Sequence, residues 1–332
     1  MKNLLRILAA LIGAAVLVAI SIAAWFLYGA YIDRSHPSVA TQVVIVRGST
    51  FDQVAQRLAG KGVIASAPAF RVLAKLGHDA TRVRAGAYRF VPHQSEEEVL
   101  HALLSGSGQV AYWVTIPEGF TAKQIAARLQ SAGIGRAAAF ERTFVETSLN
   151  VGGVRTPNLE GYLFPSTYLV PVDATPSQVA KQLTGQFFAE LPANAAVKAK
   201  ALHVTLPQVV TVASLIEREA KVDADRPLIA GVIYNRLRIG MPLQVDATIE
   251  YALPHHAAAL TYADLAIRSP YNSYLHRGLP PTPIANPGLP SLEAALHPAK
   301  TDALYYVYCG GGRHVFAKTL TEQQANVARC LK

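Results

Sequence analysis

The N-terminal thirty residues constrain this 332-residue chain more than any other feature. Lys2 and Arg6 precede an apolar run, from Ile7 to Tyr28, that contains no charged residue. About twenty apolar residues, each rising about 1.5 Å in a helix, are enough to cross a hydrocarbon core of about 30 Å. We therefore expect a cytoplasmic tip and one transmembrane anchor within residues 1–32.

The residues that flank the apolar run predict its orientation. Lys2 and Arg6 favour a cytoplasmic N-terminus. Aromatic residues typical of the opposite interface lie at the far end of the run and just after it: Trp25, Phe26, Tyr28 and Tyr31. A cleaved signal peptide is the alternative, because Ser21-Ile22-Ala23 resembles a cleavage site, but the apolar run exceeds the usual signal core of about 7–15 residues. We expect the chain after Asp33 to lie outside the cytoplasm.

Composition limits the class of protein and its partners. With 51% hydrophobic residues the chain can bury a core, and its length suggests about two domains. The net charge of +9 favours anionic neighbours, but export from the cytoplasm argues against nucleic acid. The two cysteines rule out a disulfide scaffold and a Cys-rich zinc module. Cys309 and Cys330 can pair in an oxidising compartment, although their spacing leaves the pairing open.

A strand–turn–helix pattern occurs twice in the first half of the chain. Residues 43–46 favour a strand and 48–58 a helix, and 119–129 repeat this layout. In both copies a glycine and an aliphatic residue follow the helix, at Gly62-Val63 and Gly133-Ile134. Any strand–turn–helix unit gives such a pattern, so a duplication stays open. The first copy resembles a LysM-type sugar-binding module.

The pattern predicts an α+β protein with a domain boundary between residues 112 and 150. The segments between the two copies favour a strand at 87–91, a helix at 95–104 with Ser95 and Glu98 as its capping box, and a strand at 112–116. We expect a small LysM-like α+β module at 40–110 and a larger α+β catalytic domain at 111–332.

Two carboxylates lie near the end of a helix that Thr205 and Gln208 cap. Helical spacing places Glu219 on one stripe with three apolar residues: Val209, Val212 and Ile216. Partial desolvation at the end of such a stripe raises the pKa of a carboxyl group. A general acid that works at neutral pH needs this property.

Glu217 lies about 200° from the apolar stripe of Glu219, on the face of Ala213 and Leu206. We expect it to support the other carboxylate or to be solvated. The alternative is that both glutamates are ordinary helix-end residues, one of them paired with Arg218 or Arg226.

The segments that follow have the composition of a carbohydrate groove. Residues 241–248 are predicted to be extended, with Gln244, Asp246 and Thr248 on the same side. Loops rich in Pro, Gly, Asn and Tyr follow at 269–274 and 278–288. Such loops are rigid, polar and aromatic, which suits sugar binding, although turn chemistry alone can also produce them.

Several segments resemble the endolytic murein transglycosylase family (MltG, YceG-like). The likeness runs in order along nearly the whole chain and rests on NLEGYLFPSTY at 158–168, SLIERE at 214–219, YNRL at 234–237, MPLQVDAT at 241–248, GLPP at 278–281 and HPAKTD at 297–302. Four positions depart from the family pattern: Ser166, Val245, Ala247 and Thr282. These departures put Ser166 and Thr282 in doubt as functional positions.

The resemblance implies cleavage of MurNAc–GlcNAc bonds within peptidoglycan strands, leaving 1,6-anhydro-MurNAc ends and terminating the elongation of nascent strands. It implies a single-pass protein of the bacterial inner membrane with a periplasmic bulk, wall synthases as candidate partners, and no cofactor. The catalytic glutamate of the family matches Glu219. We expect Glu219 to protonate the glycosidic oxygen and then, as a carboxylate, to accept the proton of the MurNAc 6-hydroxyl.

The remaining candidates have supporting or binding roles. Glu217 and Asp246 are the supporting carboxylates, and Asp246 at hydrolase spacing from Glu219 would indicate a muramidase-type hydrolase instead. Candidate contacts to the glycan are Asn235, Gln244, Thr248, Tyr271, Asn272, Tyr274 and Glu160.

Other motifs carry less chemistry. His255-His256 lacks the ligand spacing of a zinc site, so no metal is expected. Arg313-His314 follows three glycines and is interpreted as part of a hairpin turn rather than a site. A non-catalytic glycan-binding scaffold of wall synthesis, with Glu219 idle, is the alternative to an enzyme.

Overall fold

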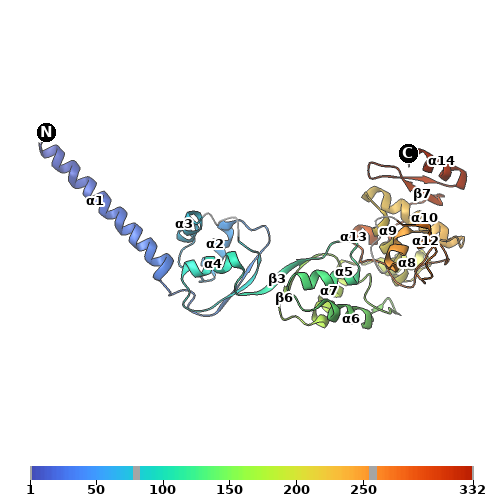
Figure 1. Ribbon diagram of the computed structural model, residues 1–332, viewed down its shortest axis with the longest axis horizontal. Helices are drawn as coiled ribbons and strands as arrows, with labels where there is room; N and C mark the ends of the chain where they lie inside the picture. The colour runs from blue at the N-terminus through green and yellow to red at the C-terminus, as the bar shows by residue number, and fades with distance from the viewer. Residues whose placement is uncertain (1, 78–82, 254–259, 331–332) are drawn as a thin grey trace. The chain divides into compact units, whose positions relative to one another are not determined.

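A computed structural model describes residues 2–77, 83–253 and 260–330. The fold mixes helices with short antiparallel strands (Figure 1). The chain divides into two compact units: Met1–Trp113 with Leu169–Val172, and Val114–Tyr168 with Asp173–Lys332. His255 and His256 lie outside the described residues, as do the side chains of Lys2, Arg6 and Tyr31.

The first unit begins with helix α1 (Lys2–Leu27), which continues as one π-helical turn (Tyr28–Ile32). Within the described residues, α1 is the one continuous helix that is long and apolar enough to cross a membrane; the pair α8 (Ala195–Ala201) and α9 (Leu206–Glu219) qualifies only as a bent combination. The end of the α1 segment is not free, because Ala30 is buried and Phe26 packs beside it in the core of this unit. The anchor and the module therefore share their packing at residues 26–30.

The rest of the first unit is a β–α–α–β–α arrangement. Its elements are β1 (Thr41–Ile45), α2 (Phe51–Gly60), α3 (Ala67–Leu76), β2 (Gly86–Phe90) and α4 (Glu96–Ser105). Strands β1 and β2 are antiparallel, with Val43 opposite Tyr88. Capping boxes at Thr50 and Ser95 start α2 and α4, because each side chain accepts a backbone N–H that the helix cannot satisfy itself.

The first part of the second unit repeats this order. Its elements are β3 (Gln109–Thr115), which begins in the first unit, α5 (Ala122–Ser131), α6 (Ala137–Glu146), the hairpin β4 (Asn150–Val151) and β5 (Val154–Arg155), β6 (Thr167–Pro171) and α7 (Pro176–Glu190). The four longer strands form one sheet in the order β1-β2-β3-β6.

The strand–turn–helix pattern of the sequence thus occurs as two matching local structures. After α2 and after α5 a glycine adopts a left-handed backbone, Gly62 with φ +67° and Gly133 with φ +82°. The next residue, Val63 or Ile134, is buried and donates its N–H to the helix it has just left, at 2.9 and 3.0 Å respectively. The glycine is needed at both places because a Cβ disfavours this backbone conformation.

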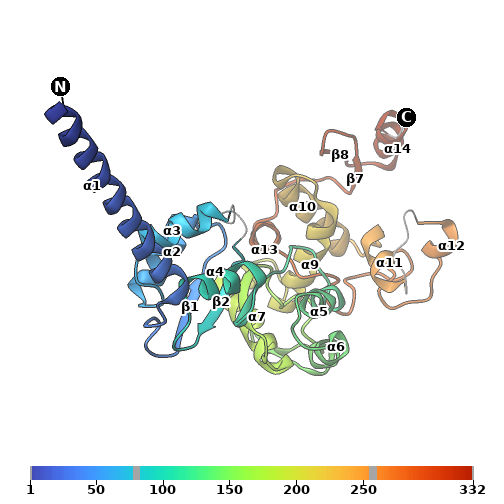
Figure 2. The ribbon, with the colours of Figure 1, turned by 60° about the vertical axis from the view of Figure 1, so that its left-hand side comes forward.

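The larger part of the second unit is built around α9, whose eight residues 209–216 are all buried. The other elements are α10 (Arg226–Arg238), α11 (Asp246–Ala252), α12 (Tyr262–Leu265), α13 (Leu289–Leu296), the hairpin β7 (Tyr305–Tyr308) and β8 (His314–Ala317), and α14 (Leu320–Cys330). Helices α10 and α13 pack against α9, and the hairpin lies against α14 (Figure 2). Gly231 permits close packing of α10, since a Cβ there would lie 2.7 Å from the carbonyl oxygen of Ala299.

The prediction of an extended segment at 241–248 is wrong. Gln244 has a left-handed backbone, with φ +49°, and α11 begins at Asp246. Thr248 lies in the first turn of that helix, where its hydroxyl donates to the carbonyl of Val245 at 2.7 Å. Gln244 and Asp246 are exposed whereas Thr248 is buried, so the three residues do not share a side.

Cys309, in the β7–β8 turn, forms a disulfide with Cys330 at the end of α14, and their Cα atoms are 4.5 Å apart. We expect maleimide labelling in denaturant to tag neither thiol until a reductant is added, and to tag both afterwards. Two tags on the unreduced protein would contradict the pairing.

Two truncations distinguish the anchoring role of α1 from its contribution to the core of the first unit. Removing residues 1–24 should release the protein from membranes and leave the packing of Phe26 and Ala30 intact. Removing residues 1–32 should also release it, but with a lower melting temperature, because the buried contacts at 26–30 are lost. Sedimentation in high salt and thermal melts check both results, and a 1–24 deletion that still sediments with membranes would contradict the single anchor.

Candidate active site

A polar cavity of about 300 Å³ lies at the C-terminal end of α9. Helices α9 and α10 contribute Glu219 and Arg236, the loop before α11 contributes Gln244, and the first residue of α11 is Asp246. The remaining lining comes from Tyr274 and from the β7–β8 hairpin, which contributes Tyr306, Val307, Tyr308 and His314. The cavity thus combines carboxylates with aromatic rings and one guanidinium group.

Glu219 is half-buried at the end of the apolar stripe that helical spacing predicts, and Val209, Val212 and Ile216 are fully buried. The Tyr306 hydroxyl donates a hydrogen bond to Oε2 of Glu219 at 3.0 Å. Burial raises the pKa of Glu219 to about 7; the Tyr306 bond opposes this rise and the charge of Asp246 adds to it. Weaker influences come from two other charged residues, Lys221, which lowers the pKa, and Glu250, which raises it. A carboxyl group with this pKa can give and take a proton near neutral pH.

Glu217 faces a different environment, although it is only two residues away. Its side chain is 7% exposed, pairs with Arg226 at 3.3 Å and accepts the N–H of Gly288 at 3.1 Å. Arg226 also pairs with Asp223 at 3.0 Å. The expectation of a solvated Glu217 is therefore wrong. Of the two arginines that the sequence offered as partners, Arg218 and Arg226, Glu217 pairs with Arg226.

Four of the residues predicted from the sequence meet in this cavity: Glu219, Gln244, Asp246 and Tyr274. The hydroxyl of Tyr274 donates to Oδ1 of Asp246. Gln244 is held from its backbone, since its N–H donates to the carbonyl of Ser273 at 3.0 Å, which leaves its exposed amide side chain available to a ligand.

Three other predicted residues are buried and bonded within the protein. The amide of Asn235 donates to the carbonyls of residues 301 and 303, both at 2.9 Å. The amide of Asn272 donates to the carbonyls of residues 265 and 267, at 3.0 and 2.9 Å. Thr248 bonds the hydroxyl of Ser273 at 2.9 Å. All three side chains fasten loops, and none of them lines the cavity of Glu219.

Glu160 lines a second cavity, of about 530 Å³. Its buried carboxylate accepts hydrogen bonds from Ala122 N–H at 3.0 Å, Asn286 at 2.9 Å and the Tyr251 hydroxyl at 3.2 Å. Burial raises the pKa of Glu160 to about 7, although these hydrogen bonds favour the charged form and oppose the rise. Tyr271 packs its ring 4.9 Å from that of Tyr251.

Consecutive residues of α9 and of α11 line the two different cavities. Arg218 lines the second cavity and the next residue, Glu219, lines the first. Likewise Asp246 lines the first cavity and Ala247 the second.

Sequence reasoning missed Tyr306, Arg236 and His314 as residues of the cavity. The guanidinium of Arg236 is buried, donates to the carbonyls of residues 304 and 243 at 2.6 and 2.5 Å, and lies 5.3 Å from the Tyr305 ring centroid. His314 belongs to the glycine-rich hairpin, which the sequence predicted as a turn. The hairpin is confirmed, but it also forms one wall of the cavity.

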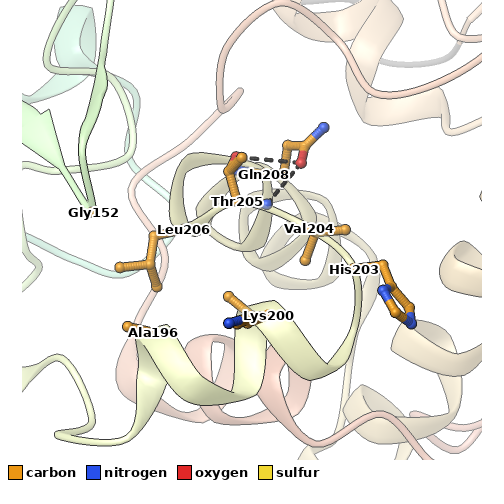
Figure 3. Close-up of a pocket in the computed structure, with 9 residues that line it drawn as sticks. Gly152, Ala196, Lys200, His203, Val204, Thr205, Leu206 and Gln208 are labelled. Atoms are coloured by element: carbon orange, nitrogen blue, oxygen red, sulfur yellow. Dashed lines mark hydrogen bonds between the residues drawn. The ribbon is translucent and has the colours of Figure 1, made fainter.

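Another hollow, of about 480 Å³, lies where α8 meets α9 (Figure 3). Thr205 and Gln208 bond one another there, beside Lys200 and His203. Among the described residues that line it there is no carboxylate. Within the described ranges, no three His, Cys, Asp or Glu residues gather as metal ligands would.

The fold and the first cavity define a protein with a protonatable carboxylate at the end of a core helix. Residues 43–329 match the YceG-like family, and the chain belongs to that family. It is 35% identical over 316 residues to the endolytic murein transglycosylase of Bacillus subtilis, covering 90% of this chain and 87% of that protein.

The chain is also 31% identical over 331 residues to the endolytic murein transglycosylase of Streptococcus pneumoniae strain D39. That match covers 90% of this chain but 59% of the longer pneumococcal protein. A crystal structure of a YceG-like protein from Listeria monocytogenes is similar with a TM-score of 0.62 and 33% identity, covering 87% of this chain and 99% of the other.

Tyr306→Phe tests the contact on Glu219. The hydroxyl bond favours the charged carboxylate, so its loss should raise the pKa of Glu219. A reaction that needs protonated Glu219 should then keep its activity to higher pH. The alkaline limb of the activity–pH profile should therefore shift to higher pH. An unchanged limb in a folded variant would contradict the role of this bond.

Proposed function

We propose that this protein is a membrane-anchored endolytic lytic transglycosylase of peptidoglycan. The names of its relatives support the reaction class, and the observation that carries the proposal is Glu219, whose burial raises its pKa to about 7 in a polar, aromatic cavity. The substrate is the bond between MurNAc C1 and the GlcNAc oxygen within a glycan strand.

Glu219 performs both proton transfers. As the C1–oxygen bond breaks, the protonated carboxyl gives its proton to the departing GlcNAc oxygen and positive charge develops at C1. The carboxylate then takes the proton of the MurNAc 6-hydroxyl, whose oxygen bonds C1 and closes the 1,6-anhydro ring. Glu219 ends protonated, and no water is consumed.

The neighbours of Glu219 have matching roles. The exposed carboxylate of Asp246 stabilises the positive charge at C1, and Tyr274 holds that carboxylate in place. Tyr306 orients Glu219. The amide of Gln244 and the ring of Tyr274 contact the sugar.

The second cavity takes the sugars that continue the strand. An enzyme that cuts within a polymer must hold it on both sides of the bond, and consecutive residues, at 218–219 and at 246–247, line the two cavities. Glu160 lines it together with Tyr251, and the ring of Tyr271 packs against that of Tyr251.

The N-terminal parts place the enzyme at the wall. Helix α1 is long and apolar enough to cross a membrane. We infer that it crosses the inner membrane with its N-terminus in the cytoplasm and the bulk of the chain in the periplasm. The β–α–α–β order within residues 40–110 supports a LysM-like glycan-binding module, with residues 111–332 as the catalytic domain. Such a tether keeps the active site near new strands and near wall synthases, so that cleavage terminates elongation.

A muramidase-type hydrolase is the second candidate, because Asp246 lines the same cavity as Glu219. The products distinguish the two reactions. Muropeptides released from purified sacculi should carry 1,6-anhydro ends, whereas reducing MurNAc ends would indicate hydrolysis with Asp246 as the second carboxylate. No released muropeptides from folded protein would indicate a scaffold.

Glu219→Gln and Glu217→Gln should separate catalysis from stability. Glu219→Gln cannot cycle a proton, so turnover should fall by about 10²–10⁴-fold or more while the melting temperature holds. Glu217→Gln weakens a buried ion pair with Arg226, so it should lower the melting temperature while the folded fraction keeps most of its turnover. An inactive, fully folded Glu217→Gln beside an active Glu219→Gln would assign the acid to Glu217.

A further inference from the structure

Tyr306 reaches Glu219 from the β7–β8 hairpin, and this hairpin is fastened to the body of its unit by Asp225. Oδ2 of Asp225 accepts two hydrogen bonds from one residue, His314: the backbone N–H at 2.7 Å and the ring Nδ1 at 2.9 Å. Both side chains are buried, with 8% of Asp225 and 5% of His314 exposed. The carboxylate therefore fixes both the backbone and the ring of His314.

The ring of His314 in turn packs on Tyr306. Their centroids are 5.5 Å apart and the planes meet at 88°, an edge-on contact. Tyr308, which lies directly opposite His314 in the hairpin, also packs on the His314 ring, with centroids 5.8 Å apart. A continuous series of contacts thus leads from Asp225 through His314 and Tyr306 to Oε2 of Glu219.

The local position of Asp225 does not account for this arrangement. Asp225 directly precedes α10, where an aspartate usually accepts a backbone N–H of the helix that follows, but its side chain makes no such cap bond. Its carboxylate is directed instead to a residue 89 positions along the chain. The hairpin end that it holds is the one that lines the cavity of Glu219.

We propose that Asp225 and His314 are positioning residues that set the hydroxyl of Tyr306 against Glu219. The proposal rests on Glu219 as the proton donor of the proposed function. Neither residue exchanges a proton with the substrate. They act through Tyr306 alone, so their effect on Glu219 disappears when the Tyr306 hydroxyl is absent.

A double-mutant cycle tests this dependence. The cycle compares wild type, Asp225→Asn, Tyr306→Phe and the double variant in the full-length protein, by kcat/KM on peptidoglycan strands as a function of pH. Asp225→Asn should shift the alkaline limb to higher pH, as Tyr306→Phe does. It should also lower kcat/KM about fivefold, which corresponds to the net contribution of about one hydrogen bond. The double variant should match Tyr306→Phe alone.

Asp223→Asn is the matched control, since Asp223 lies two residues away, is 83% exposed and pairs with Arg226 instead. It should leave the pH profile unchanged. If Asp225→Asn unfolds, as a thermal melt will show, His314→Phe replaces it in the cycle. This variant keeps a ring on Tyr306 and removes the bond between the ring Nδ1 and Asp225, while the backbone N–H of residue 314 keeps its bond to Asp225. Additive effects in the double variant, or an unmoved limb in a folded single variant, would overturn the proposal.

A second readout does not require turnover. The pKa of the Glu219 carboxyl, followed by NMR in protein labelled with ¹³C at glutamate, should rise in Asp225→Asn and should rise no further in the double variant. This result would stand even if the wild type released no anhydro-muropeptides, so a failure of the proposed function and a failure of the positioning role can be told apart. No rise in the folded single variant would refute the positioning role.

Discussion

Helix α9 runs through the core of its unit, and the rest of the site depends on where that helix ends. Val209, Val212 and Ile216 are fully buried, so the first polar group on their stripe, Glu219, lies at the boundary between core and cavity. A charge in that position is poorly solvated, and the pKa of the carboxyl rises to about 7. The packing of an apolar stripe therefore sets the chemistry of the group at its end.

Two glutamates on one helix acquire different properties because their partners differ. Glu217 has a cation, Arg226, and a backbone N–H to stabilise its charge. Glu219 has a tyrosine hydroxyl and a nearby carboxylate, Asp246, but no ion pair among the described contacts. Proteins commonly give two nearby carboxyl groups different roles, one as the acid and one as a supporting group, by surrounding them with different partners.

Local chemistry made much of this structure predictable. The capping boxes at Ser95 and Thr205 have their predicted bonds, and the apolar stripe of α9 is buried. The repeated strand–turn–helix pattern also corresponds to two matching local structures, because each rests on a cap, an amphipathic helix and a left-handed glycine. These are short-range features, and the sequence records them directly.

The rest depended on partners far along the chain. Tyr306 meets Glu219 across 87 residues, and the amide of Asn235 bonds carbonyls 66 and 68 residues away. Nothing in the composition of a loop tells whether its asparagine faces a sugar or fastens another loop. Alternation at 241–248 was misleading for a related reason, because backbone bonds to Ser273 and the start of α11 interrupt the strand-like pattern.

The most direct test of the central claim is the pKa of Glu219 itself. In wild-type protein labelled with ¹³C at glutamate, the carboxyl resonance that is absent in Glu219→Gln identifies the residue, and its chemical shift can be followed from pH 3 to pH 9 with no substrate present. A midpoint at about 7 is predicted. A midpoint near 4.5, the ordinary value for a glutamate carboxyl, would show that the end of α9 does not prepare an acid, and would contradict the assignment of Glu219 as the proton donor.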